Sequence, residues 1–160
     1  MIKHVLIPTD FTVKSLQVVR YALEDAGTAK LNILLFHMVD IPHSITDLLF
    51  FSKEQLRKKL INQDFKDACA VLRNKYASSV ADIQCEVFYG STAAVFENYV
   101  DARNVDVIMY NKSLILKKID ARSVDPYALI RRCRKPLMDI SHTATQQEGQ
   151  VDLFTILSGT

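Results

Sequence analysis

The chain has little glycine, and the places where it is missing are informative. Only four of its 160 residues are glycine, namely Gly27, Gly90, Gly149 and Gly159. The run from Val107 to Asn111 predicts a buried strand that leads into a loop, and that loop contains no glycine. In α/β nucleotide-binding proteins such a loop brings backbone amides close to phosphates, and close approach favours residues without a side chain. The absence argues against a glycine-rich phosphate cradle.

Cysteine, excess charge and long apolar runs are also scarce. The three cysteines, Cys69, Cys85 and Cys133, are far apart and form no CxxC pair. That pattern suits reduced thiols rather than a disulfide framework or a metal site. No apolar run is long enough to span a bilayer, and the start of the chain enters a strand without a signal-peptide pattern. We therefore expect a cytoplasmic protein with no membrane partner. A net charge of +2, with basic residues dispersed among acids, gives no sign of a nucleic-acid partner.

What is present is an alternation of strand and helix patterns. Apolar, β-branched runs predict strands at 2–7, 31–39, 83–89, 106–110 and 137–140. Apolar positions at helical spacing predict helices at 12–27, 52–76, 92–100 and 123–134. Residues 42–51 are expected to form a loop of unusual apolar content, whose side chains cap the core or line a pocket or partner surface.

The order of these elements predicts an α/β fold with a parallel sheet and helices on both faces. Residues 1–140 are expected to form a single domain. The polar stretch that follows predicts a linker, so residues 141–160 are assigned to a linker and a C-terminal extension. Within that extension, the apolar residues 151–157 are expected to dock on the body or on a partner subunit.

The sequence motifs, in this order, resemble the universal stress protein family over residues 2–140. The stretch from Lys3 to Thr12 is similar to the family's first strand and its Pro-x-Asp-x-Ser/Thr turn. The stretch from Leu34 to Val39 resembles its second strand, and that from Val105 to Met109 its fourth. The resemblance implies a doubly wound, Rossmann-like fold of the adenine nucleotide alpha hydrolase-like type. Together with the alternation it predicts a five-stranded parallel sheet in the order 3-2-1-4-5.

Nucleotide-binding members of that family carry Gly-x2-Gly-x9-Gly-[Ser/Thr] after the fourth strand. An ungapped count places Tyr110, Ser113, Ser123 and Val124 at those four positions, so all three glycines are absent. A shift of one residue puts Arg122 and Ser123 at the last pair and recovers the hydroxyl. The resemblance thus implies that the phosphate half of the site has been replaced.

The other half of the site is similar to that of the family. Asp10 and Val39 match positions that lie beside adenine and ribose in family members. An equally supported role for Asp10 is to order its own turn. Four basic residues follow the fourth strand and could bind phosphate as point charges, or belong to a solvated surface loop: Lys112, Lys117, Lys118 and Arg122. Tyr110 could stack on a base or fill the cavity. His37 is expected to be a satisfied core histidine rather than a catalytic base.

These features favour a non-enzymatic stress-response or regulatory protein that contacts an unidentified protein partner. No cofactor and no metal are expected. The short strand from Leu137 to Ile140 would leave an edge with unpaired backbone groups, which a two-fold axis can pair with its own copy, so we expect a homodimer. The alternative is an adenine-nucleotide-binding module, or weak ATPase, in which Asp10, Val39, Tyr110, Lys112, Ser113, Arg122 and Ser123 bind the nucleotide.

Overall fold

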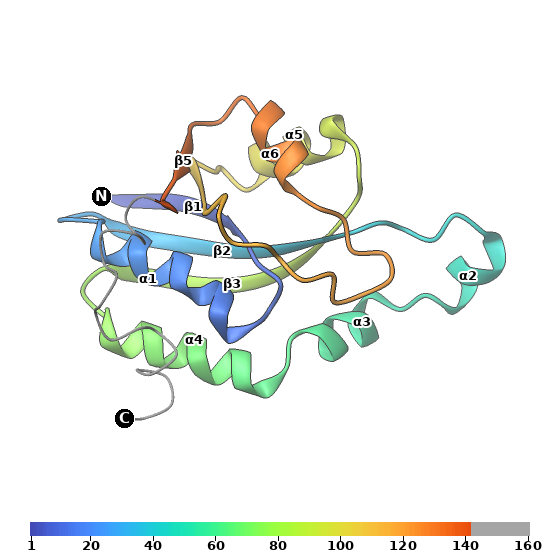
Figure 1. Ribbon diagram of the computed structural model, residues 1–160, viewed down its shortest axis with the longest axis horizontal. Helices are drawn as coiled ribbons and strands as arrows, with labels where there is room; N and C mark the ends of the chain where they lie inside the picture. The colour runs from blue at the N-terminus through green and yellow to red at the C-terminus, as the bar shows by residue number, and fades with distance from the viewer. Residues whose placement is uncertain (142–160) are drawn as a thin grey trace.

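The structure, a computed structural model, describes residues 1–141, and its core is a sheet of five parallel strands. The strands lie in the order β3-β2-β1-β4-β5, as predicted from the sequence (Figure 1). Their bounds are β1 (Ile2–Pro8), β2 (Lys30–Val39), β3 (Val80–Tyr89), β4 (Val107–Tyr110) and β5 (Leu137–Asp139). The predicted linker and extension, and the expected docking of residues 151–157, lie outside the described residues apart from Ser141.

Helices cover both faces of the sheet (Figure 1). The 3-10 turn η1 (Val13–Leu16), α1 (Gln17–Glu24) and α4 (Gln63–Lys75) pack on one face. The other face is covered by α5 (Ala93–Ala102) and α6 (Tyr127–Arg132). Alternate residues of the strands enter the two cores, as the pleat of a strand requires. Thus Leu35 lies in the first core and Phe36 in the second.

The helix predicted over residues 52–76 is in fact two helices, α3 (Lys53–Leu60) and α4. Ile61 leaves helical geometry with φ −97° and ψ 92°, and the Asn62 side chain then accepts the Phe65 backbone N–H at 2.9 Å. An Asn side chain competes for backbone groups and favours a helix start over a helix interior. The apolar spacing continues through the break, which is why periodicity alone did not show it.

The loop predicted over residues 42–51 contains a helix, α2 (Ile45–Phe50), whose start is capped by Ser44 accepting the Asp47 N–H at 3.0 Å. Figure 1 shows α2 at the end of an arm that projects from the body, beyond α3. Most of its apolar side chains therefore do not cap the core, contrary to one expectation from the sequence. Phe51, just after the helix, packs against the core.

The helix predicted over residues 123–134 is limited to α6, because Ser123 and Val124 are bonded to the end of β2 and Pro126 starts the helix. The third strand begins at Val80, three residues before its predicted start. Within residues 1–141, every helix falls short of the length and apolar character needed to cross a bilayer.

Candidate functional site

A cavity of about 480 Å³ opens at the carboxyl ends of β1 and β2. Thr9, His37 and Met38 line it from the strand ends. The remaining lining residues come from the start of α6 and from residues 111–126, which we call the post-β4 loop. Open α/β sheets bind ligands at the carboxyl ends of their strands, so this cavity is the candidate site of the fold.

Asp10 is buried beside this cavity without lining it. Its Oδ1 accepts hydrogen bonds from the backbone N–H of Thr12, at 3.1 Å, and from the Thr12 hydroxyl. Its Oδ2 accepts the backbone N–H of Lys117 at 2.8 Å. Both carboxylate oxygens therefore have partners within the chain, and they fix the turn after β1 and the post-β4 loop above it.

His37, which is buried, and Ser123, which is half-buried, form a polar pair at the wall of the cavity. The Thr9 carbonyl can only accept, so His37 Nδ1 donates to it at 2.8 Å. In the neutral ring Nε2 is then an acceptor, and the Ser123 hydroxyl donates a hydrogen bond to it at 2.7 Å. Burial lowers the pKa of His37, against the opposing effects of the Thr9 bond and of Asp10 and Asp120. The ring is thus held neutral.

A serine bonded to a histidine is the arrangement that activates a nucleophile, but here the bond links the post-β4 loop to β2. A backbone carbonyl, not a carboxylate, orients the ring, and the Ser123 oxygen also accepts the Asp120 N–H at 3.1 Å. His37 is therefore a satisfied core histidine, as expected. Its partnership with Ser123 was not foreseen, because the two residues lie 86 positions apart in the sequence.

The last part of the post-β4 loop is paired with the end of β2. Val39 and Ser123 form an antiparallel bridge, flanked by hydrogen bonds from the Val124 N–H to the Met38 carbonyl and from the Asp40 N–H to the Arg122 carbonyl, both 2.9 Å. Val39 is fully buried by this pairing and does not line the cavity. The pairing covers the end of β2 at Val39, one of the two residues that the family resemblance places beside adenine and ribose.

Backbone amides of the loop point to acceptors of this same chain. The N–H of Ser113 donates to the Asn111 side chain at 2.8 Å, and that of Arg122 to the Asp120 carboxylate at 2.9 Å. The Ser123 N–H donates to the Asp120 carbonyl at 3.0 Å. These three amides lie at positions that the count assigned to the phosphate motif or next to them. Their donors are occupied within the chain.

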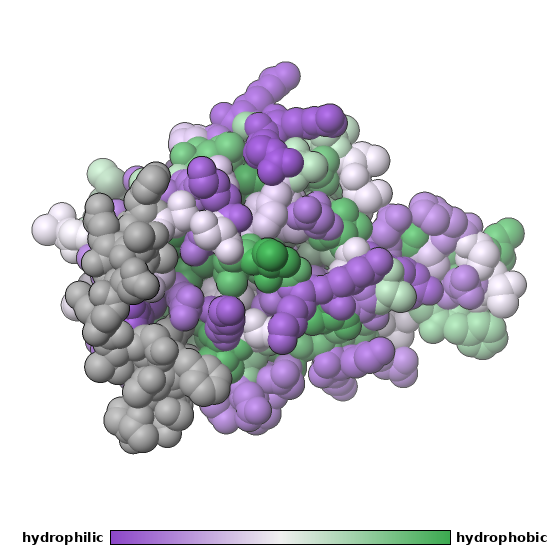
Figure 2. Space-filling model, viewed as in Figure 1, coloured by the Kyte–Doolittle hydropathy of each residue, from purple (hydrophilic) through white to green (hydrophobic). Residues whose placement is uncertain are grey.

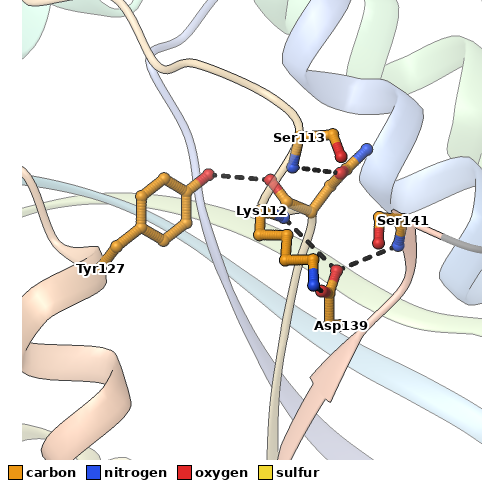
Figure 3. A network of polar contacts seen from close by, with 6 residues as sticks. Lys112, Ser113, Tyr127, Asp139 and Ser141 are labelled. Carbon is orange, nitrogen blue, oxygen red and sulfur yellow. Dashed lines mark hydrogen bonds and ion pairs between the residues drawn. The ribbon is translucent and has the colours of Figure 1, made fainter.

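The start of the loop is held by a polar network between β5 and α6 (Figure 3). Asp139 accepts the backbone N–H groups of Lys112, at 3.4 Å, and of Ser141, at 3.0 Å, and the Lys112 ammonium lies 3.7 Å from its other oxygen. Burial by itself would raise the pKa of Asp139, but these partners lower it. The carboxylate therefore stays ionised and keeps the loop on the sheet edge.

Tyr127 holds the loop from its other side. Its hydroxyl lies 3.2 Å from the Asn111 carbonyl and 3.0 Å from the Leu114 carbonyl, which share its proton. Burial, with the nearby carboxylates, raises the pKa of Tyr127 to about 12, so the hydroxyl remains a donor. The sequence pointed to Tyr110 as the ring at the cavity. Tyr110 instead packs in the core beside α6, with its ring 6.0 Å from that of Tyr127, and Tyr127 lines the cavity.

Three of the four basic residues that the sequence singled out in the loop line the cavity, and the fourth faces elsewhere. Lys112, Lys117 and Lys118 line the cavity, and Lys112 is paired with Asp139. Arg122 faces away, with its guanidinium 5.7 Å from the centre of the Phe51 ring. Over residues 1–141 no group of His, Cys, Asp and Glu side chains has the arrangement of a metal site.

Comparison with known proteins finds one family model that matches more than half of the chain. The model of the universal stress protein family matches residues 1–111. No curated protein matches the chain. A universal stress protein from Lactobacillus plantarum has a similar structure, with a TM-score of 0.55 and 17% identity over 86% of this chain and 96% of that one. A universal stress protein family protein from Arabidopsis thaliana, solved with AMP bound, has a TM-score of 0.51 and 12% identity over 92% of this chain and 97% of its own.

Proposed function

Because this chain belongs to the universal stress protein family, we propose that it is a non-enzymatic stress-response or regulatory protein that acts without ATP. The observation that carries the proposal is that backbone N–H groups of the post-β4 loop are already hydrogen-bonded within the chain. A phosphate cradle needs several free amides that converge on one anion. In this chain the amides of Ser113, Arg122 and Ser123 are bonded to its own oxygens. Binding a triphosphate would require breaking these bonds.

The exposed arm supports a role in protein contacts. The apolar side chains of α2 are largely open to solvent: Ile45 is 78% exposed, Leu49 76% and Phe50 83%. Figure 2 shows this apolar surface at the right-hand end of the molecule, over α2. Exposed clusters of large apolar side chains are typical of surfaces that bind other proteins. The partner in this proposal is an unidentified protein that buries the α2 arm.

The edge of β5, which no other strand covers within residues 1–141, supports the proposed homodimer. β5 lies at the end of the strand order, and Leu137 and Met138 are 37% and 38% exposed. In parallel β4–β5 pairing the Pro136 carbonyl and the Ile140 N–H bond to β4, so the backbone groups of Leu137 and Asp139 face outward. A second copy related by a two-fold axis can satisfy these groups.

Titration calorimetry with ATP and magnesium tests the nucleotide part of the proposal. Losing two or three charge-assisted hydrogen bonds, each worth about 1.5–3 kcal/mol, weakens affinity by several orders of magnitude. We expect no heat of binding at protein concentrations of roughly tens of micromolar. The Arabidopsis protein solved with AMP bound is a positive control for AMP under the same conditions. A dissociation constant in the low micromolar range would overturn the proposal.

The alternative function, an adenine-nucleotide-binding module or weak ATPase, is favoured by one specific observation. The cavity of about 480 Å³ beside Thr9 is open, and Lys117 and Lys118 line it. A monophosphate needs fewer donors than a triphosphate, so AMP should be titrated beside ATP. If AMP binds, the double variant Lys117→Ala, Lys118→Ala should abolish binding. Arg122→Ala should leave it unchanged, since Arg122 faces Phe51.

A further inference from the structure

A second hollow, of about 400 Å³, lies between α4 and the edge strand β3, and it holds two of the three cysteines. Cys69 reaches it from α4 and Cys85 from β3. Three cationic side chains line the same hollow, those of Arg57, Lys66 and Arg73. None of these five residues lines the cavity at the carboxyl ends of β1 and β2. The two sites are thus distinct.

The two thiols face the same hollow. Cys69 is buried, at 2% exposed, and Cys85 is half-buried. Interaction between the two thiols lowers the pKa of Cys85 and raises that of Cys69. Burial opposes the shift at Cys85, and the charges of Arg57, Arg73 and Lys66 reinforce it. The pair is therefore asymmetric, and Cys85 is the sulfur that loses its proton more readily.

The arginines are held in place beside Cys85 by the backbone of β3. Arg57 Nη1 donates to the carbonyl of Cys85 at 2.7 Å, and Arg73 Nη2 donates to the carbonyl of Ile83. Arg73 also lies 4.0 Å from the Asp82 carboxylate. β3 is the last strand of the sheet, so its outward carbonyls are available for these bonds. The positive charge near the sulfur is consequently fixed rather than freely mobile.

We propose that Cys85 and Cys69 form a peroxide-responsive dithiol site, with Cys85 as the attacking sulfur and Cys69 as the resolving one. The Cys85 thiolate attacks one oxygen of hydrogen peroxide, the O–O bond breaks, and the departing hydroxide takes a proton to become water. Cys85 is then a sulfenic acid, oxidised by two electrons. The Cys69 sulfur attacks the sulfenic sulfur, the S–O bond breaks, and the released hydroxide takes the Cys69 proton as a second water. A disulfide remains.

The placement of both cysteines in one hollow favours the second step, because a disulfide needs a sulfur–sulfur distance of about 2.05 Å. Cys85, whose pKa is lowered, is also the more accessible of the two sulfurs, which is the usual arrangement of a peroxide-sensitive pair. The third thiol, Cys133, is suited to serve as an internal reference, because burial raises its pKa.

Mass spectrometry of the full-length, reduced chain tests the proposal. Iodoacetamide at neutral pH should modify Cys85 faster than Cys133. Limiting hydrogen peroxide should lower the intact mass by the mass of two hydrogen atoms, and digestion without reductant should yield a peptide linking Cys69 to Cys85.

Two cysteine variants test the roles of the individual thiols. In Cys69→Ser, peroxide should leave a Cys85 sulfenic acid that dimedone traps. In Cys133→Ser, the linkage should form as in the unaltered chain. Equal labelling of Cys85 and Cys133, or a disulfide that uses Cys133 or a second chain, would overturn it.

A second pair of variants distinguishes the effect of the nearby positive charge on Cys85 from an effect of the substitution on folding. Arg57→Gln removes a cation beside Cys85, while Lys58→Gln changes an exposed neighbour on α3 that does not line the hollow. The rate of Cys85 alkylation near neutral pH should fall about tenfold for each unit by which the pKa of Cys85 rises in Arg57→Gln. Lys58→Gln should keep the original rate. Equal rates in the two variants, with both proteins folded by circular dichroism, would contradict the role of the cationic hollow.

Discussion

His37 shows how a single side chain joins parts of this chain that are distant in sequence. Its ring bonds to the Thr9 carbonyl after β1 and to the Ser123 hydroxyl in the post-β4 loop, while its own residue belongs to β2. In the neutral ring Nδ1 donates to the Thr9 carbonyl and Nε2 accepts from the Ser123 hydroxyl. Protonation would make Nε2 a donor as well, so the Ser123 hydroxyl would have to turn and accept from it.

The stability of the fold should therefore fall in mild acid. The pKa of His37 is lowered in the fold, so between the ordinary value of 6.5 and the folded value the unfolded chain binds a proton that the folded chain does not. The contribution of His37 is complete above the unfolded pKa and is lost as pH falls below it. The loss is at most about 1.4 kcal/mol per pH unit. Urea unfolding at about pH 7.5 and about pH 5.5 measures it.

His37→Gln should reduce this pH dependence, whatever its effect on stability at neutral pH. His43→Gln is the matched control, because the His43 side chain is 87% exposed. The same pH dependence in both variants would show that groups other than His37 cause the loss.

Individual residues differ in how far the sequence could place them. The turn role of Asp10 was one of its two predicted roles, because an Asp after a strand often accepts nearby amides. The bond from Lys117 to Asp10 could not be predicted, since it joins positions 107 apart. Tyr127 was missed for the same reason. Nothing local to a tyrosine in the first turn of a helix indicates that its hydroxyl reaches a loop.

Among the elements, the post-β4 loop depends most on long-range side-chain bonds. It contains no helix or strand of its own. Asp10, Asp139 and Tyr127 each bond to its backbone from a different part of the fold. These three anchors and the pairing with the end of β2 hold its conformation. The amides of Ser113 and Arg122 bond to side chains of the loop itself, those of Asn111 and Asp120.

Tyr127→Phe should loosen this loop. The substitution leaves the Asn111 and Leu114 carbonyls without the phenol donor and should lower the free energy of unfolding by about 1 kcal/mol. Limited trypsin digestion should cut faster at Lys117 and Lys118. Tyr110→Phe is the matched control, since it keeps the ring contact between the two side chains and should digest as the unaltered chain does. Equal digestion of both variants would contradict the anchoring role of Tyr127.

The sequence predicted the strands better than the helices. β2 and β4 are nearly continuous apolar runs, so their signal does not depend on phase. β3 alternates apolar and polar residues, and its start was placed three residues late. The break between α3 and α4 falls at Ile61, which is buried like a helical core residue and so preserves the apolar spacing. α2 was hidden by its composition, because its exposed leucines and phenylalanine do not alternate with polar residues.

At the level of the whole molecule, the proposed dimer depends on the exposed edge of β5. In Met138→Glu, the new carboxylate of one subunit would lie close to the same carboxylate of the other subunit across the two-fold axis. Like charges in that position destabilise strand pairing. We expect light scattering to give a dimer for the unaltered chain and a monomer for the variant. Val71→Glu changes a residue of similar exposure, 37%, on α4 and should leave the dimer intact. A monomeric unaltered chain, or a dimeric Met138→Glu variant, would contradict this interface.

The two borders of the sheet are not equivalent, and this limits how copies of the chain can add to one another. Along β3, the guanidinium groups of Arg57 and Arg73 already occupy the outward carbonyls of Cys85 and Ile83. A strand from another molecule would have to displace both charges before it could extend the sheet there. Growth from β5 alone ends after one addition, whereas growth from both borders would produce filaments. The arginines thus favour a closed pair over an open polymer, and Arg73→Ala would remove part of that protection.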